Sequence, residues 1–140
     1  MKVLSMTWTI YDSRLKEFAY NYTGAGMVIK NICEYIGRHA ESYLLLGKCR
    51  LPQMQLGHIH IVGTDAEPDV EEEGLGRVEK HLRVMTNAFR SALERIKPDI
   101  VDFHGIGELT QRCIGVCIET KTPYVYTEHL FIAKDKQFDQ

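Results

Sequence analysis

The sequence lacks an excess of charge of either sign. The 140 residues include 17 lysines and arginines against 19 aspartates and glutamates, so the formal net charge is -2. The basic balance typical of nucleic-acid-binding proteins is therefore missing, and we expect no nucleic-acid partner. No run approaches the roughly 18 apolar residues that cross a membrane, and the first residues do not resemble a signal peptide. These absences predict a cytoplasmic protein with no transmembrane segment, and they leave peripheral membrane contact open.

The spacing of the four cysteines matches no metal motif. None of the four cysteines forms a CxxC pair or lies near a histidine at zinc-finger spacing. We interpret Cys113 and Cys117, four residues apart on a predicted helix, as core residues. His58 and His60 share one face of a predicted edge strand, and we favour a solvent-facing role over a metal pair. The acidic run within 64–76 is interpreted as a solvated loop, so we expect no metal and no cofactor.

What the sequence does contain is a regular alternation of strand and helix patterns. Strands are predicted at 2–8, 42–46, 58–62, 99–103 and 124–127, and helices at 24–37, 77–96 and 108–119. This alternation predicts an α/β protein with a Rossmann-like, doubly wound, mostly parallel sheet. The gap between the second and third strands is short for a parallel crossover, so we expect these two strands to form an edge hairpin.

The expected strand order across the sheet is third, second, first, fourth, fifth. The chain then changes direction between the first and fourth strands, and ligands of such sheets bind beyond the strand carboxyl ends at this switch point. The residues that should gather there follow the first, fourth and fifth strands: Tyr11, Asp12, Gly24 and Gly26; His104 and Gly105; Glu128 and His129.

Two of these features keep alternative interpretations. The Gly24-Ala25-Gly26 turn is either an ordinary loop-to-helix turn or a place where backbone N–H groups approach a phosphate. A dinucleotide fingerprint would need glycine where Ile29 stands, and a much shorter loop, so we reject an NAD-type site. His104 is either a residue that caps local backbone or a ligand-facing histidine, and the nearby glycines favour the second interpretation.

Three segments resemble a known family in the order in which they occur. They are Thr23-Gly24-Ala25-Gly26, the KPDIVDFHG segment 97–105 and the TPYVYTEH segment 122–129; the strand around Tyr43, with the segment at His58 after it, matches the family's early sheet edge. Together they resemble the N-terminal domain of the family 4 (group 1) glycosyltransferases, which have the GT-B fold. Asp102 departs from the family, which often has histidine at this position.

The resemblance implies an enzyme of carbohydrate biosynthesis. Such enzymes transfer a sugar from a nucleotide-diphosphate donor to an acceptor, with retention at the anomeric carbon, and the nucleotide sugar is a substrate rather than a cofactor. A second Rossmann-like domain holds most of the donor. We therefore expect residues 1–140 to be the N-terminal, acceptor-side domain in truncated form, without its C-terminal donor-binding domain and inactive alone.

The resemblance also implies a role for each candidate residue. Gly24 and Gly26 would face the donor diphosphate, and His104 would be the catalytic residue that hydrogen-bonds the transferring sugar; the acceptor side would comprise Tyr11, Asp12, Glu128 and His129. Two alternatives remain. One is a stand-alone flavodoxin-like module that binds a phosphorylated small molecule, and the other is a non-catalytic subunit of a split glycosyltransferase.

Overall fold

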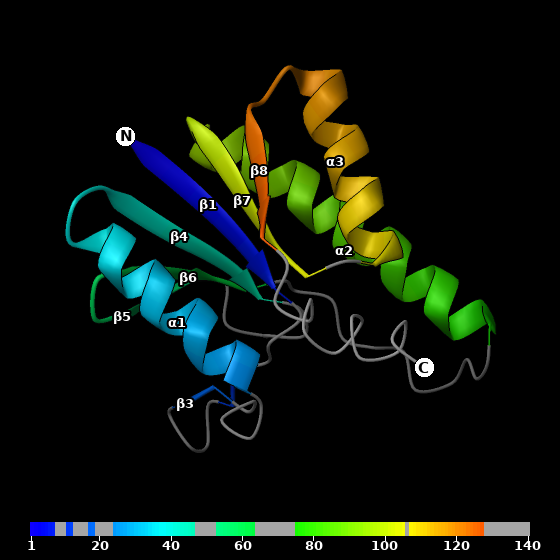
Figure 1. Ribbon diagram of the computed structural model, residues 1–140. Coiled ribbons are helices and arrows are strands. Elements are labelled where there is room, and N and C mark those ends of the chain that lie inside the picture. Colours follow the sequence, from blue (N-terminus) through cyan, green and yellow to red (C-terminus); the bar gives the residue numbers. More distant parts are fainter. Residues whose placement is uncertain are drawn as a thin grey trace, which may run out of the picture.

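The protein is an α/β domain in which three helices cover a six-stranded, mostly parallel, Rossmann-like sheet (Figure 1). The computed structural model describes residues 1–7, 11–12, 17–18, 24–46, 53–63, 75–105 and 107–127. Its elements are β1 (Lys2–Thr7), β2 (Tyr11–Asp12), β3 (Glu17–Phe18), α1 (Gly24–Gly37), β4 (Glu41–Leu46), β5 (Gln53–Leu56), β6 (Ile59–Val62), α2 (Leu75–Ile96), β7 (Ile100–His104), α3 (Glu108–Thr120) and β8 (Tyr124–Thr127).

The strand order in the sheet is β5-β6-β4-β1-β7-β8. The predicted order of the five expected strands is thereby confirmed, with β1 between β4 and β7 at the switch point (Figure 1). Strands β6, β4, β1, β7 and β8 run parallel to one another. Strands β2 and β3 pair in a separate, antiparallel two-stranded sheet.

The edge hairpin exists, but its two strands are not the predicted ones. Strands β4 and β6 pair in parallel, and the hairpin is formed by β6 with β5, a strand that the sequence analysis missed. The physical reason is that β5 runs antiparallel to β4 and returns the chain to the edge of the sheet at which β4 begins, as a crossover helix would. Strand β6 can therefore run parallel to β4. Gly57 makes the tight turn between β5 and β6 with φ of 57°, in the left-handed region that glycine adopts readily.

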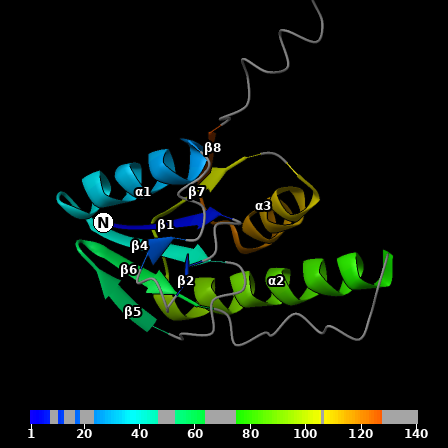
Figure 2. The ribbon, with the colours of Figure 1, turned by 90° about the horizontal axis from the view of Figure 1, so that it is seen from below.

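The helices lie on both faces of the sheet, α1 on one and α2 with α3 on the other (Figure 2). Helix α1 contacts β4, β1 and β6. It ends at Gly37, as predicted, and a Cβ at this position would collide with the carbonyl oxygen of His58. Glycine therefore lets the end of the helix approach the hairpin. Helix α2 ends at Ile96, just before Pro98, which cannot continue a helix.

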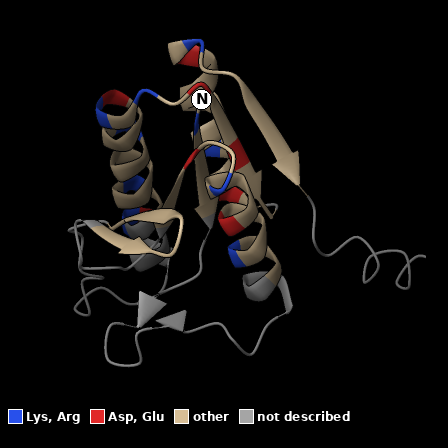
Figure 3. Cartoon of the chain, turned by 90° about the vertical axis from the view of Figure 1, so that its left-hand side faces the viewer, with Lys and Arg blue, Asp and Glu red and all other residues tan. Residues whose placement is uncertain are grey.

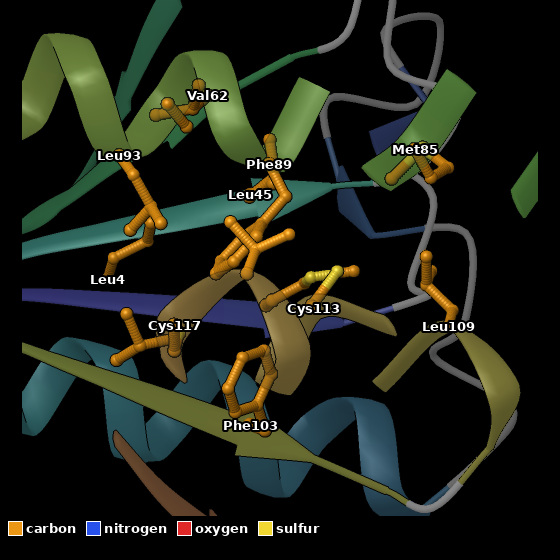
Figure 4. Close-up of a cluster of buried hydrophobic side chains, with 14 of the residues drawn as sticks. Leu4, Leu45, Val62, Met85, Phe89, Leu93, Phe103, Leu109, Cys113 and Cys117 are labelled. Atoms are coloured by element: carbon orange, nitrogen blue, oxygen red, sulfur yellow. The ribbon is translucent and has the colours of Figure 1, made fainter. Parts of the chain in front are cut away.

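Most of the apolar core lies between the sheet and the α2–α3 layer (Figure 4). The two helices contribute the following buried residues to this core: Leu82, Met85, Phe89, Ala92, Leu93, Ile96, Leu109, Cys113, Val116 and Cys117. The rings of Phe89 and Phe103 lie 5.6 Å apart, centroid to centroid, in a tilted arrangement. A smaller cluster under α1 contains Ile29, Cys33 and Leu44.

Lysine and arginine positions are interspersed with aspartate and glutamate positions along the helices (Figure 3). Two ion pairs of the described residues join α2 to α3: Arg112 with Glu79, at an N–O distance of 2.7 Å, and Arg90 with Glu119, at 3.0 Å. None of the described helices is long and apolar enough to span a lipid bilayer.

Candidate functional site

Strands β1, β7 and β8 end at about the same level of the sheet. Met6 of β1 is in register with Phe103 of β7, and His104 is in register with Thr127, the last residue of β8. The backbone N–H of Gly105 then donates to the carbonyl oxygen of Thr127 at 3.0 Å. The carboxyl ends of β1, β7 and β8 therefore meet as the predicted strand order requires.

The structure describes only some of the other predicted site residues. Gly24 and Gly26 belong to the first turn of α1, and Tyr11 and Asp12 form β2. Glu128 and His129 directly follow β8 but lie outside the described residues, so the acceptor-side role predicted for them stays a prediction.

His104 reaches the expected edge of the sheet, but its imidazole is enclosed by the protein. The side chain has an exposed fraction of 0%, and its Nε2 lies 3.1 Å from Oδ2 of Asp102. The other oxygen of Asp102 accepts a 3.4 Å hydrogen bond from the hydroxyl of Thr127. An enclosed ring does not touch a ligand in this conformation, so the arrangement is that of a pair of side chains that orient the end of β7.

Sequence reasoning missed the role of Asp102, although a signal for it exists. Residues two apart on a strand point to the same face, so Asp102 and His104 had to be neighbours if 99–104 formed a strand. Thr127 could be added only once the register between β7 and β8 was known.

The thiol of Cys33 lies close to this polar group and is not reactive. Burial is the main reason that the pKa of Cys33 is raised to about 11; the negative charge of Asp102 acts in the same direction, and a hydrogen bond with Ser5 opposes both. A thiol with this pKa is almost fully protonated near neutral pH, whereas nucleophiles and metal ligands are thiolates. Cys33 therefore acts as a small core residue at the base of the site.

The turn between β7 and α3 leaves open space beside the buried pair. Gly105 has a φ of 84°, and a Cβ added at Gly105 or Gly107 would meet no atom of the described residues within 4 Å. Gly107 caps α3 without a side-chain hydrogen bond, while the hydroxyl of Thr110 donates to the carbonyl of Gly105 at 3.0 Å. Backbone N–H groups at the start of α3 can therefore approach an anion, which the helix dipole favours.

The two histidines that could have suggested a metal pair make separate contacts. His58 lies in the turn before β6, where its Nδ1 is 2.5 Å from Oε1 of Glu34. The ring of His60 stacks on Tyr43, with centroids 4.9 Å apart. Strand β6 is also not the edge strand we expected, because β5 lies outside it. Within the described ranges, no three His, Cys, Asp or Glu residues are grouped to hold a metal ion.

The remaining predicted pair, Cys113 and Cys117, is confirmed as core. Both side chains are buried between α3 and the sheet, and burial raises their pKa values to about 12 and about 11.

Comparisons with known proteins establish the fold and nothing further. No family model matches the sequence, and no curated protein matches it significantly. Among solved structures, the chain is similar to the C-terminal domain of the PF1911 hydrogenase from Pyrococcus furiosus, represented by two crystal structures. The TM-scores are 0.59 and 0.56, each at 13% identity, and the matches cover 89% and 90% of this chain and the same shares of those chains. At this identity the likeness supports a Rossmann-like α/β fold alone.

Proposed function

We propose that this chain is the N-terminal, acceptor-side domain of a retaining GT-B glycosyltransferase, which moves a sugar from a nucleotide-diphosphate donor to an acceptor. The observation that carries the proposal is the position of the KPDIVDFHG segment. It forms β7, next to β1 at the switch point, and its last two residues, His104 and Gly105, stand at the carboxyl edge where ligands of such sheets bind.

The backbone at this edge has the donors that the reaction needs. Departure of the nucleoside diphosphate leaves negative charge, which N–H groups at a helix start stabilise. The first turn of α1, with Gly24 and Gly26, and the turn at Gly105 and Gly107 both present such groups. A second Rossmann-like domain would hold the rest of the donor, and closure of the two domains would exclude water.

Within this proposal His104 is a positioning residue rather than the sugar's hydrogen-bond partner. Its enclosed ring contacts Asp102, which in turn accepts from Thr127. The three side chains hold the ends of β7 and β8 together, and those ends carry the turn at Gly105 and the segment that begins with Glu128. Catalysis would depend on them through the geometry of these two loops.

Activity of the protein together with a donor-binding domain tests the proposal. We expect Asp102→Asn to lower kcat, because the turn at Gly105 and the segment that begins with Glu128 are displaced when Asp102 no longer holds the ends of β7 and β8. The matched control is Asp99→Asn, since Asp99 lies on the opposite edge of the sheet, where its carboxylate accepts from the Lys2 backbone N–H. Equal kcat values for the two variants, or no glycosyl transfer by the assembled protein, would contradict the proposal.

A second function, binding of a phosphorylated small molecule without catalysis, is favoured by the open space at Gly105 and Gly107. The isolated chain separates the two functions. Under the glycosyltransferase proposal these 140 residues bind nucleotide sugars weakly or not at all. Saturable, tight calorimetric binding of a sugar phosphate, with NMR shifts of the Gly105 and Gly107 amides, would establish the binding module instead.

A further inference from the structure

A groove lies on the α2 face of the sheet, beside the last turn of α2 and over residues of β4, β5 and β6. Its volume is about 450 Å³, within the range of small-molecule sites. We propose that this groove is a second binding site, for a small molecule that carries a planar aromatic ring and an anionic group, either phosphate or carboxylate.

The aromatic part of the site is built on two neighbouring strands. Tyr43 of β4 and His60 of β6 are in register, and their rings are stacked at 25° with centroids 4.9 Å apart. Both rings are only half-buried, and Gln55 of β5 continues the same row. A stacked pair with exposed ring surface is a platform on which a further planar ring can stack, in the offset or edge geometries that aromatic groups prefer.

The charge of the groove is positive. Lys2 and Arg95 line it, and none of the aspartates and glutamates that the structure describes does. Arg95 lies in the last turn of α2, is exposed, and forms no ion pair with any residue in the ranges that the structure describes. The ammonium group of Lys2 already makes one hydrogen bond, because its Nζ donates to the carbonyl oxygen of Ile96 at 3.3 Å. The groove thus offers one uncommitted guanidinium and a neighbouring ammonium to an anion.

Two carboxylates beside the groove accept hydrogen bonds from neutral groups, so they keep their negative charge close to the two cations. Oε2 of Glu41 accepts from the hydroxyl of Tyr43 at 3.0 Å, an arrangement that also fixes the phenol ring. Oδ2 of Asp99 accepts from the backbone N–H of Lys2 at 2.7 Å. Neither carboxylate lines the groove.

The groove is separate from the carboxyl edge of β7. Lys2 begins β1 and Ile96 ends α2, so the cationic end of the groove lies at the amino edge of the sheet. His104 lies at the opposite, carboxyl edge of the sheet. Its side chain is also on the opposite face of the sheet from those of Val101 and Phe103, which pack against α2 and α3. Binding in the groove is therefore independent of the proposed sugar transfer.

NMR titration of the 140-residue chain with phenyl phosphate and with benzoate tests this site. We expect at least one of these probes to shift signals of Gln55, His60 and Arg95, with a dissociation constant in the range of about 1 mM or tighter. Inorganic phosphate has the charge without the ring, and phenol has the ring without the charge, so each should bind at least about tenfold more weakly.

Two substitutions separate the contributions of charge and of ring stacking to binding in the groove. Arg95→Gln should weaken binding about tenfold through loss of a charge-assisted hydrogen bond, and His60→Val should weaken it about two- to tenfold through loss of ring stacking. The matched control is Arg83→Gln, which removes an exposed arginine from the same helix away from the groove. If His60→Val does not fold, Arg95→Gln still decides, because Arg95 is exposed.

Three results would overturn the proposal. They are the absence of shifts at the groove with both aromatic probes at about 10 mM, equal affinity for inorganic phosphate and phenyl phosphate, and equal weakening by Arg83→Gln and Arg95→Gln.

Discussion

Truncation of His104 to alanine should destabilise the protein, because the imidazole is enclosed and contacts a carboxylate. The side chain has no exposed surface, and Asp102, its 3.1 Å neighbour, has a side-chain exposure of only 12%. Loss of the ring leaves a cavity and deprives a mostly buried carboxylate of one partner. Loss of a partner of a buried polar group costs about 1–3 kcal/mol, and the cavity adds to this, so we expect a total of about 2–4 kcal/mol.

Urea unfolding followed by circular dichroism measures this loss as a lower midpoint with an unchanged slope. The control is His39→Ala, since His39 is exposed and merely contacts the ring of Tyr35; we expect a change within about 0.5 kcal/mol. A double-mutant cycle with Asp102→Ala should give a coupling energy of about 1–3 kcal/mol. Equal stabilities of the two histidine variants, or a coupling energy near zero, would refute the assignment of a buried, interacting pair.

Three further predictions concern the scaffold, each measured as a change in the free energy of unfolding. Phe89→Ala should cost about 3–5 kcal/mol, because the ring is fully buried against Phe103; a cost typical of surface residues would show that the core is arranged differently. Gly37→Ala should cost about 1–3 kcal/mol, since its Cβ would meet the carbonyl of His58, and a neutral effect would contradict this contact. Hydrogen bonds from His58 lower the pKa of Glu34 below 4.5, so the stability that Glu34 adds is present above that pH and is lost as the pH falls through its folded-state pKa. Glu34→Gln should therefore be less stable than the native protein at neutral pH and should approach it in acid; a pH-independent difference would exclude this linkage.

The helices and parallel strands were predictable from local patterns. The spacing of Leu82, Met85, Phe89 and Ile96 places one apolar stripe along α2, and the structure buries that stripe. Because alternating helices and strands have few right-handed arrangements, the order of five strands could also be inferred. For the candidate site, only its location at the carboxyl edge of β1, β7 and β8 could be predicted, and the contacts of its side chains could not.

What could not be predicted depends on contacts between distant segments. QMQL in 53–56 is too short and too polar to be recognised as a strand, and it becomes one because β6 offers an edge to pair with. The enclosure of His104 likewise depends on the whole surroundings of the sheet edge, whereas its sequence neighbours, two glycines, suggested an open position.

The sequence by itself determined the three helices, the five parallel strands and the order of these elements, because helix and strand periodicity are properties of consecutive residues. Only the tertiary structure decided that β5 completes the sheet edge, that Asp102 and His104 form an enclosed pair, and that Lys2 and Arg95 meet Tyr43 and His60 around one groove. The physical reason is that these contacts join residues far apart in the chain, and their distances depend on strand register and on how far α2 extends across the sheet.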